Sequence, residues 1–525
     1  MSLQPVLLAG QWRPASAAGT FRAENPATGE TLPDEFPVSS WSDCELALDA
    51  AAAAATELRA ALPKQIAGFL TRFAGRIEAR SAELAAIACL ETALPQKPRL
   101  IEVELPRTTG QLRQAAAAVL DGSWAVPTID TKLNIRSLLA PVGPVLVFGP
   151  NNFPFAYNGV AGGDFAAAIA AGNPVIAKAH PCHPKTTQRL AEEASFALGE
   201  CGLPAATVQM LYHLAPADGL RFVANLRLGA VGFTGSRAAG LQIKAAADAV
   251  GRPVYLEMSS LNPVVILPGA LAERGGAIAG ELAGSCLAAG GQMCVSPGLT
   301  MLFAGEAAEQ FIQTVKVKLE STPPATLLSS GVAANLAASV KKLQAAGAEL
   351  VTGGFGVGRN CFANTLLRAN GEQFLADPNP LQTEAFGNAT LIVVVRDADE
   401  AQAVVCRLEG HLTGSVYSSM SGADDALYAR LAPLLRGRVG RLLNDKMPTG
   451  VAVTAAMNHG GPFPATGHPG FTAVGFPAAL RRFTMLQCYD NVRSARLPVA
   501  LQNRNPNGSL WRLVDGQWTQ ADITG

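Results

Sequence analysis

Short apolar segments alternate with helical segments between residues 145 and 233, and this alternation restricts the fold more than any other feature of the chain. The apolar segments are 145–148, 174–178, 208–211 and 230–233. Continuous apolar strands are typical of parallel sheets that are covered by helices on both faces. The order strand, helix, strand, helix therefore predicts an α/β fold with a doubly wound, Rossmann-like parallel sheet.

The flanking sequence predicts further elements. Residues 5–24 predict a hairpin, and residues 41–120 have the apolar spacing of helices. A second alternating region covers residues 259–470, with apolar strands at 264–267, 300–303, 391–395 and 414–417. After a linker at 505–509, the Asp-Gly pair within 510–518 predicts a small hairpin. A chain of 525 residues is too long for one core, so we expect two or three domains.

Charge and cysteine content narrow the classes of function. The 41 Lys and Arg residues balance 41 Asp and Glu residues, which favours neither nucleic acid nor a membrane surface as a partner. Nine scattered cysteines without a CxxC pair indicate a reducing compartment. The first ten residues lack a signal-peptide pattern, so we expect a cytoplasmic protein. The six histidines are dispersed without an HExxH motif; we assign none to a metal and identify no His–Cys dyad.

Cys294 ends the loop Gly290-Gly291-Gln292-Met293-Cys294, which consists largely of small residues. Such a loop suits a nucleophile, because glycines let the backbone approach a ligand and a nearby N–H can hold an oxyanion. A free cysteine is also commonly a small buried apolar residue. Cys286, the nearest other cysteine, follows a helical pattern, and we expect it to be buried in a helix interior.

Five motifs in order resemble the aldehyde dehydrogenase superfamily. They are Phe148–Pro154, Val231–Ser236 with Gly240, Leu256–Pro263, Gly291–Cys294 and Glu384–Gly387. The resemblance extends to about residue 490. Segments 162–164, 457–466, 481–483 and 488–489 are similar to the branch that contains NADP-dependent 2,5-dioxovalerate (α-ketoglutarate semialdehyde) dehydrogenase and the fatty aldehyde dehydrogenase of luminous bacteria.

The resemblance implies oxidation of an aldehyde to a carboxylic acid through a thiohemiacetal and a thioester. Cys294 would be the nucleophile, Glu257 the general base and Asn152 the oxyanion donor, with Asn151 as an alternative to Asn152. Glu257 follows an apolar segment, and a carboxylate at the end of a buried strand would have a raised pKa suited to taking a proton from water. One departure is that Ser259-Ser260 replaces the family's glycine pair.

The resemblance also implies a nicotinamide cofactor. The residues that match its binding positions are Lys178, Gly235, Gly240, Glu384 and Phe386. Ser236 is a candidate donor to a phosphate oxygen, and His180, two residues after Lys178, would either lie near the ribose or have a packing role. NAD-restricted relatives commonly carry a glutamate three residues after the lysine, where this chain has Pro181. A 2′-phosphate would therefore meet no carboxylate from this loop and pair with Lys178. We expect NADP to be preferred, with NAD possible.

The expected substrate tunnel is mostly apolar. Its candidate residues are Phe153, Tyr157, Asn158, Met293, Val295 and Phe463, with no Arg or Lys among them. A semialdehyde acid needs a cation or several donors for its distal carboxylate. The tunnel thus favours a medium aliphatic or aromatic aldehyde, whereas the branch favours α-ketoglutarate semialdehyde, which we retain as the leading substrate. The alternatives are a CoA-acylating enzyme, which usually lacks the base, and a non-catalytic family member.

By the same resemblance, the chain divides into four parts. Residues 1–122 and 141–258 would form the dinucleotide-binding domain, and 259–475 the catalytic domain. Residues 123–140 and 476–497 would form a bridging element, and 498–525 a C-terminal tail hairpin. Bridging strands join a partner subunit's sheet in relatives, so we expect a homodimer or a dimer of dimers.

Overall fold

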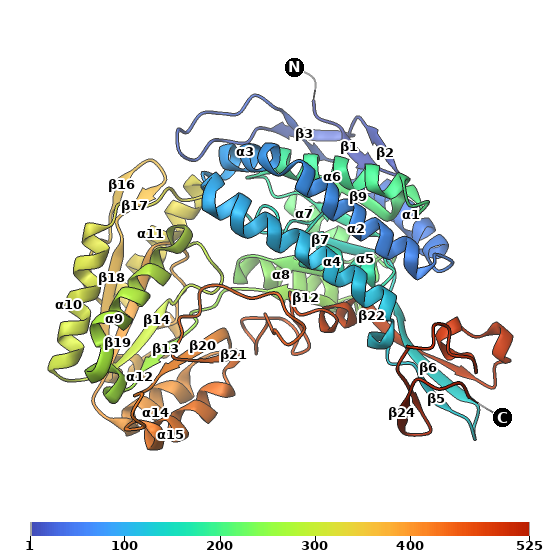
Figure 1. Ribbon diagram of the computed structural model, residues 1–525. Helices are drawn as coiled ribbons and strands as arrows, with labels where there is room; N and C mark the ends of the chain where they lie inside the picture. Colours follow the sequence, from blue (N-terminus) through green and yellow to red (C-terminus); the bar gives the residue numbers. More distant parts are fainter. Residues whose placement is uncertain (1–2, 524–525) are drawn as a thin grey trace.

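The computed structural model describes residues 3–523, in which three large sheets organise the chain (Figure 1). Residues up to about 258 surround the first sheet, and residues from about 264 to 444 surround the second. A third, smaller sheet projects from the first part near the C-terminus, in the lower right of Figure 1. Within residues 3–523, no helix combines the length and apolar character needed to cross a membrane.

The first sheet has seven strands in the order β12-β11-β7-β8-β9-β1-β2. The strands are β1 Val6–Leu8, β2 Gln11–Arg13, β7 Val145–Phe148, β8 Val175–Lys178, β9 Val208–Leu211, β11 Ala230–Thr234 and β12 Val254–Glu257. The five strands from β7 to β12 in this sheet are parallel, as predicted, and their side chains are almost entirely buried. Strand order reverses at β7, and in such sheets ligands bind at the carboxyl ends beside the reversal.

Helices cover both faces of this sheet. They are α1 Trp41–Leu58, α2 Pro63–Ala79, α3 Ser81–Thr92, α4 Leu105–Asp121, α5 Gly163–Ala170, α6 Pro184–Gly199, α7 Pro216–Val223 and α8 Arg237–Asp248. The buried face of α2 consists mainly of large side chains such as Phe69, Leu70 and Phe73, whereas α4 and α5 bury several alanines, whose methyl groups permit a close approach between backbones. A small sheet of β3 Ala17–Phe21, β4 Phe36–Ser39 and β10 His213–Leu214 lies beside them.

The second sheet also has seven strands, in the order β15-β18-β19-β14-β13-β20-β21. The strands are β13 Val264–Ile266, β14 Leu299–Phe303, β15 Glu349–Thr352, β18 Thr365–Asn370, β19 Ala389–Val395, β20 His411–Tyr417 and β21 Val439–Asn444, with β16 Gly356–Gly358 and β17 Cys361–Phe362 as a separate hairpin. The helices are α9 Pro268–Leu287, α10 Glu306–Ser321, α11 Ser330–Ala345, α12 Gly371–Ala376, α13 Pro378–Leu381, α14 Ala398–Arg407 and α15 Asp425–Arg436. Cys286 is buried in α9, as predicted.

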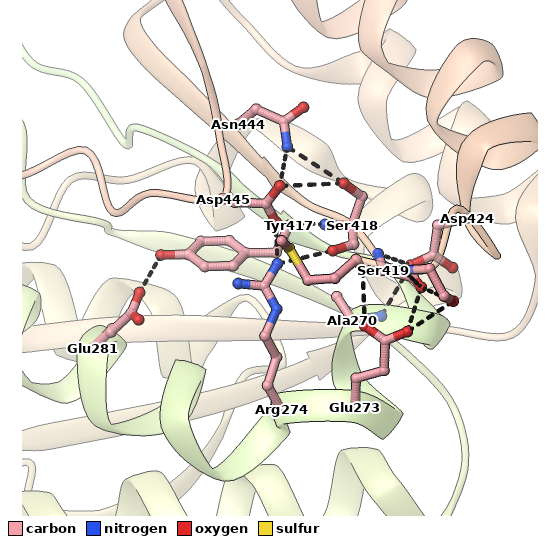
Figure 2. Close-up of polar contacts among 12 residues, drawn as sticks. Ala270, Glu273, Arg274, Glu281, Tyr417, Ser418, Ser419, Asp424, Asn444 and Asp445 are labelled. Carbon is pink, nitrogen blue, oxygen red and sulfur yellow. Dashed lines mark hydrogen bonds and ion pairs between the residues drawn. The ribbon is translucent and has the colours of Figure 1, made fainter.

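Helix α9 connects the end of β13 in the second sheet to the loop that carries Cys294. A network of hydrogen bonds holds the first turn of this helix (Figure 2). The Asp424 carboxylate accepts hydrogen bonds from the backbone N–H groups of Gly269 (2.9 Å) and Ala270 (2.9 Å), in the first turn of the helix. About three turns further on, Glu281 accepts a hydrogen bond from the Tyr417 hydroxyl at 2.6 Å. A carboxylate at a helix N-terminus satisfies free N–H groups and the positive end of the helix dipole.

The third sheet has the order β22-β6-β5-β23-β24. Its strands are β5 Thr128–Asp130, β6 Ile135–Pro141, β22 Thr484–Asp490, β23 Arg512–Val514 and β24 Gln517–Thr519. The predicted tail hairpin is thus part of this sheet, because β23 pairs in parallel with β5. Asp515 and Gly516 have positive φ angles of 48° and 84°, as the predicted two-residue hairpin turn requires.

Candidate active site

A cavity of about 400 Å³ opens at the carboxyl ends of β7, β8, β11 and β12, where the strand order predicts a ligand site. Nine residues predicted from catalysis and cofactor binding line it together. They are Asn152, Lys178, His180, Gly235, Ser236, Glu257, Cys294, Glu384 and Phe386. Gly240 is not among the lining residues: a Cβ at Gly240 would lie 2.7 Å from Met258 Sδ, so this glycine allows α8 to pack against the end of β12.

The loop before Cys294 is held in one conformation. Gly291 has a φ of 70°, and a Cβ there would lie 2.0 Å from the Gly387 carbonyl oxygen, so only glycine fits. The Asn262 side-chain amide donates to the backbone carbonyls of Cys294 (2.9 Å) and Ser296 (2.9 Å). The loop therefore presents the thiol at the cavity from a fixed backbone.

Asn152 lies against the same loop. Its side-chain Nδ2 donates to the Gln292 carbonyl at 2.9 Å, which leaves the second N–H of the amide for another acceptor. Arg99 donates to the Asn152 carbonyl at 3.1 Å, and the fully buried Glu104 accepts from the N–H groups of Phe155 (2.8 Å) and Ala156 (3.0 Å). Asn151 lines the cavity as well, but Asn152 is the one whose amide contacts the cysteine loop.

His459 joins Glu257 and Cys294, a His–Cys contact that the sequence did not identify. Its Nε2 lies 3.0 Å from Glu257 Oε1 and 3.4 Å from Cys294 Sγ. The His459 and Glu257 side chains are each 1% exposed. The second carboxylate oxygen of Glu257, Oε2, is buried without a hydrogen-bond partner among residues 3–523.

A return of the chain from the second sheet to the first explains this meeting. Residues 465–467 lie beside the end of β12, with hydrogen bonds from Met258 N to the Ala465 carbonyl (2.8 Å) and from Gly467 N to the Leu256 carbonyl (3.1 Å). That pairing brings His459 next to Glu257. The sequence offered one sign of it, a histidine followed directly by Gly460-Gly461-Pro462 in a loop.

The environment keeps Cys294 as a thiol at rest. Burial raises the pKa of Cys294 well above its usual range, the charge of Glu257 raises it further, and the nearby Arg107 lowers it. A reactive thiolate therefore requires a group that takes its proton. His459 Nε2 and the Glu257 carboxylate are the polar groups positioned beside the sulfur for that transfer.

The predicted tunnel residues Phe153 and Tyr157 lie together, and an arginine covers them. Their ring centroids are 5.2 Å apart, and the Tyr157 ring is 5.9 Å from the His459 ring. The Arg107 guanidinium lies 5.7 Å and 5.2 Å from the Phe153 and Tyr157 ring centroids and donates to the Tyr157 hydroxyl at 2.8 Å. Two of the predicted substrate residues therefore lie beside a cation, which was not among the positions that the sequence indicated. Arg107 comes from the start of α4, which the sequence indicated only as a packed helix.

A second cation approaches from the other sheet. Arg441 on β21 donates to the carbonyls of Pro448 (2.8 Å) and Gly450 (3.2 Å), and its charge interacts with Cys294 and Arg107. Burial lowers the pKa of Arg441. Within residues 3–523, the hydrogen-bond partners of these two guanidiniums are a hydroxyl, a thioether and backbone carbonyls, and none is a carboxylate.

Other predicted substrate residues lie elsewhere. Val295 packs in a small core with Leu412 and Ala465, and the partly buried Met293 packs against the hydrophobic core around the first sheet. The amide of Asn158 is used internally, donating to the Pro154 carbonyl (3.0 Å) and Thr187 Oγ1 (2.9 Å). Phe463 is 62% exposed. None of these four lines the cavity, and neither Phe153 nor Tyr157 is among its lining residues.

The two serines that replace the expected glycine pair have different surroundings. Ser259 lines the cavity. Ser260 is buried: its hydroxyl donates to Asn262 Oδ1 (2.9 Å) and accepts from Leu412 N (2.9 Å), while its backbone N–H donates to Glu384 Oε1 (3.3 Å). Ser260 therefore links Glu384 to the support of the cysteine loop.

Comparisons with known proteins agree with this geometry. Residues 12–438 match the model of the aldehyde dehydrogenase family. The chain belongs to the aldehyde dehydrogenase family. It is 38% identical to α-ketoglutaric semialdehyde dehydrogenase 2 of Azospirillum brasilense, covering 98% of this chain and 100% of the relative. It is 32% identical to α-ketoglutaric semialdehyde dehydrogenase of Acinetobacter baylyi, covering 97% of each chain.

Solved structures of the family share the fold. The chain aligns with 1-pyrroline-5-carboxylate dehydrogenase from Thermus with bound NAD at a TM-score of 0.79 and 21% identity, covering 93% of this chain and 92% of that one. It aligns with γ-glutamyl-γ-aminobutyraldehyde dehydrogenase from Burkholderia cenocepacia at a TM-score of 0.78 and 21% identity, covering 93% and 97%.

This aldehyde dehydrogenase is an NAD(P)-dependent oxidoreductase. The cavity fits a dinucleotide. The N-terminus of α8 opens into it at Gly235 and Ser236, and the Ser236 hydroxyl caps the helix by accepting from Ala239 N (3.3 Å). Burial without a paired carboxylate lowers the pKa of Lys178 to about 8, so an anionic group beside it would relieve an uncompensated charge.

Proposed function

We propose that this enzyme oxidises α-ketoglutarate semialdehyde to α-ketoglutarate with NADP as its preferred cofactor. The observation that carries the choice of aldehyde is Arg107, a cation without a carboxylate partner that covers the two aromatic tunnel residues. Both full-length relatives described above are named for this substrate, which supports the proposal.

The substrate's two ends need different partners. Its aldehyde carbon must reach the Cys294 sulfur, and its carboxylate lies at the opposite end of a five-carbon chain. The Arg107 guanidinium and the His459 ring lie 5.2 Å and 5.9 Å from the Tyr157 ring centroid, so the charge lies near the reacting atoms while its hydrogen bond goes to the Tyr157 hydroxyl. A guanidinium can hold a carboxylate through two parallel hydrogen bonds, and Arg107 Nε is buried without a partner among residues 3–523.

The residues of the site divide the chemistry. The Cys294 sulfur attacks the aldehyde carbon, and its proton passes to His459 Nε2 or to the Glu257 carboxylate. The amide of Asn152 donates its remaining N–H to the developing oxyanion. When bound, the nicotinamide supplies the hydride acceptor that turns the thiohemiacetal into a thioester. Glu257, with Oε2 free, then takes a proton from the water that releases the acid.

The test compares a charged with a neutral aldehyde. We expect Arg107→Met to lower kcat/KM for α-ketoglutarate semialdehyde by about 10- to 150-fold, since a hydrogen bond to a charged group contributes about 1.5–3 kcal/mol. Hexanal should lose less than about threefold, because it makes no such bond. Arg107→Lys should recover part of the loss.

Arg113→Met provides a matched control. Arg113 lies on the same helix α4 but pairs with Glu78 at the surface, so its removal should leave both substrates unchanged. Equal losses for hexanal and the semialdehyde in Arg107→Met would contradict the proposal. So would a wild-type enzyme that prefers hexanal, decanal or benzaldehyde by about 100-fold, or one that needs coenzyme A for turnover.

The NADP preference rests on the surroundings of Lys178. Pro181, rather than a carboxylate, stands three residues after it, and nearby His180 and His183 stack with ring centroids 5.5 Å apart. A 2′-phosphate would meet a buried cation there and no acidic side chain. We expect kcat/KM to be higher with NADP than with NAD, and Lys178→Met to reduce the NADP value more. A ratio of NAD to NADP well above one would contradict this preference.

We also propose that the enzyme is cytoplasmic and forms a homodimer or a dimer of dimers. In residues 3–523 all nine cysteines are free, as in a reducing compartment. Strand β22 is an edge of the third sheet, and its Leu486 is 66% exposed. Leu486→Lys should lower the mass measured by light scattering, whereas Leu226→Lys, at a turn residue exposed to 69% between α7 and β11, should not. A monomeric wild type would contradict the assembly.

A further inference from the structure

Glu257, Cys294 and His459 also have the composition of a metal site. One atom from each, a carboxylate oxygen, the sulfur and an imidazole nitrogen, lies within 4.8 Å of the others. This is the one such group of three ligand types found among residues 3–523. The sequence gave no reason to expect it, because the three residues are far apart in the chain and match no metal-binding spacing.

The distances suit Zn²⁺. Zinc bonds of about 2.3 Å to sulfur and about 2.0–2.1 Å to nitrogen place these two atoms about 3.5 Å apart in a tetrahedral site. The observed separation of Cys294 Sγ and His459 Nε2 is 3.4 Å. The same geometry puts nitrogen and carboxylate oxygen about 3.4 Å apart, and the observed separation from Glu257 Oε1 is 3.0 Å. The sulfur and the carboxylate oxygen lie within 4.8 Å of each other, against about 3.6 Å in such a site, so side-chain shifts would bring all three ligands to one ion.

The site also lacks what a metal would supply. The Glu257 carboxylate is buried, and its Oε2 has no partner among the described residues. His459 Nε2 faces both the carboxylate and the sulfur. In a neutral imidazole this nitrogen either donates a proton or accepts one, so it cannot donate to the carboxylate and accept from the thiol at the same time. A divalent cation would satisfy all three ligands at once.

We infer that these three residues form an inhibitory site for Zn²⁺ and similar thiophilic divalent cations. The Cys294 thiol loses its proton to solvent as the sulfur–metal bond forms, and His459 and Glu257 bind through Nε2 and a carboxylate oxygen. Three protein ligands leave a fourth position for water. Bound metal occupies the nucleophile and the water-activating base together, so the enzyme stops at the first step.

The experiment titrates Co²⁺, a coloured substitute for Zn²⁺, into the purified full-length enzyme. We expect one Co²⁺ per chain with a thiolate-to-cobalt charge-transfer band, and loss of that band on adding Zn²⁺. Cys294→Ala should abolish the band, and His459→Gln should weaken Co²⁺ binding by at least about tenfold. Cys406→Ser removes an exposed thiol elsewhere and should leave the band unchanged.

Wild-type enzyme gives an independent readout that requires no variant. Zn²⁺ should slow alkylation of Cys294 by iodoacetamide, measured by peptide mapping, and EDTA should restore both alkylation and aldehyde oxidation. A band that survives in Cys294→Ala would overturn the site. NADPH binding shows whether the His459→Gln variant is folded. If this folded variant binds Co²⁺ within threefold of the wild-type affinity, the metal is bound by the thiol alone, and the three-residue site is overturned as well.

Discussion

Replacing Glu257 by glutamine should separate the two halves of the reaction. The substitution preserves size and the oxygen that faces His459 at 3.0 Å, but an amide cannot accept a proton from water. The unpartnered Oε2 is the atom that would take the proton from water, and it belongs to a buried carboxylate. General base catalysis contributes about 10²–10⁴ in rate, or about 2.7–5.5 kcal/mol of barrier.

Stopped-flow absorbance of the reduced nicotinamide measures both phases. In Glu257→Gln we expect a burst of about one equivalent per active site, within twofold of wild type in amplitude. The steady-state rate should fall by about 10²–10³, because thioester hydrolysis becomes limiting. Glu281→Gln, which changes a glutamate of α9 that accepts a hydrogen bond from Tyr417 of β20, should leave both phases unchanged. A burst rate that falls in the same proportion as the steady state would show that Glu257 is needed for hydride transfer and would refute the reasoning.

Three further outcomes test the site and its support. Cys294→Ala should abolish both aldehyde oxidation and any esterase activity; near-wild-type turnover would end its assignment as nucleophile. Because burial raises the pKa of Cys294, its alkylation by iodoacetamide should keep accelerating with pH above the ordinary thiol pKa of about 9, and a plateau below that pH would contradict the burial argument. Asp424→Ala removes the acceptor for Gly269 and Ala270 at the start of α9 and should destabilise the enzyme by about 1–2 kcal/mol. Thermal unfolding measures this, and an unchanged midpoint would show that the network carries no stability.

The first sheet was predictable because its information is local. Strands β7, β8, β9 and β11 are each a short apolar segment between helical segments, and tertiary packing did not override that signal. The hairpin turn at Asp515-Gly516 is local in the same way, since two residues with positive φ determine it. Its place in the third sheet was not predictable, because pairing of β23 with β5 depends on segments far apart in the chain.

The site residues likewise fall into those that a local motif predicts and those that only tertiary packing brings to the site. Cys294, Glu257 and Asn152 carry recognisable motifs, and the structure brings all three to one cavity. His459 and Arg107 were missed because each reaches the site only through non-local packing, 165 positions from Cys294 in the case of His459. Val295 fails for the opposite reason: it adjoins Cys294 in sequence, but its side chain is buried in a small core with Leu412 and Ala465, against which Cys294 also packs.

The pairing of β23 with β5 sets an order for events during synthesis. Asp515, after β23, accepts a hydrogen bond from Thr131, 384 positions earlier. At translation rates of about 5–20 residues per second, β5 waits roughly 20–80 s for that partner. Until then Ile129, which is 1% exposed in the finished structure, lacks the residues that cover it, Leu497 and Leu501. Nascent chains are thus open to premature association at this sheet, and the C-terminal segment is the part that ends that exposure.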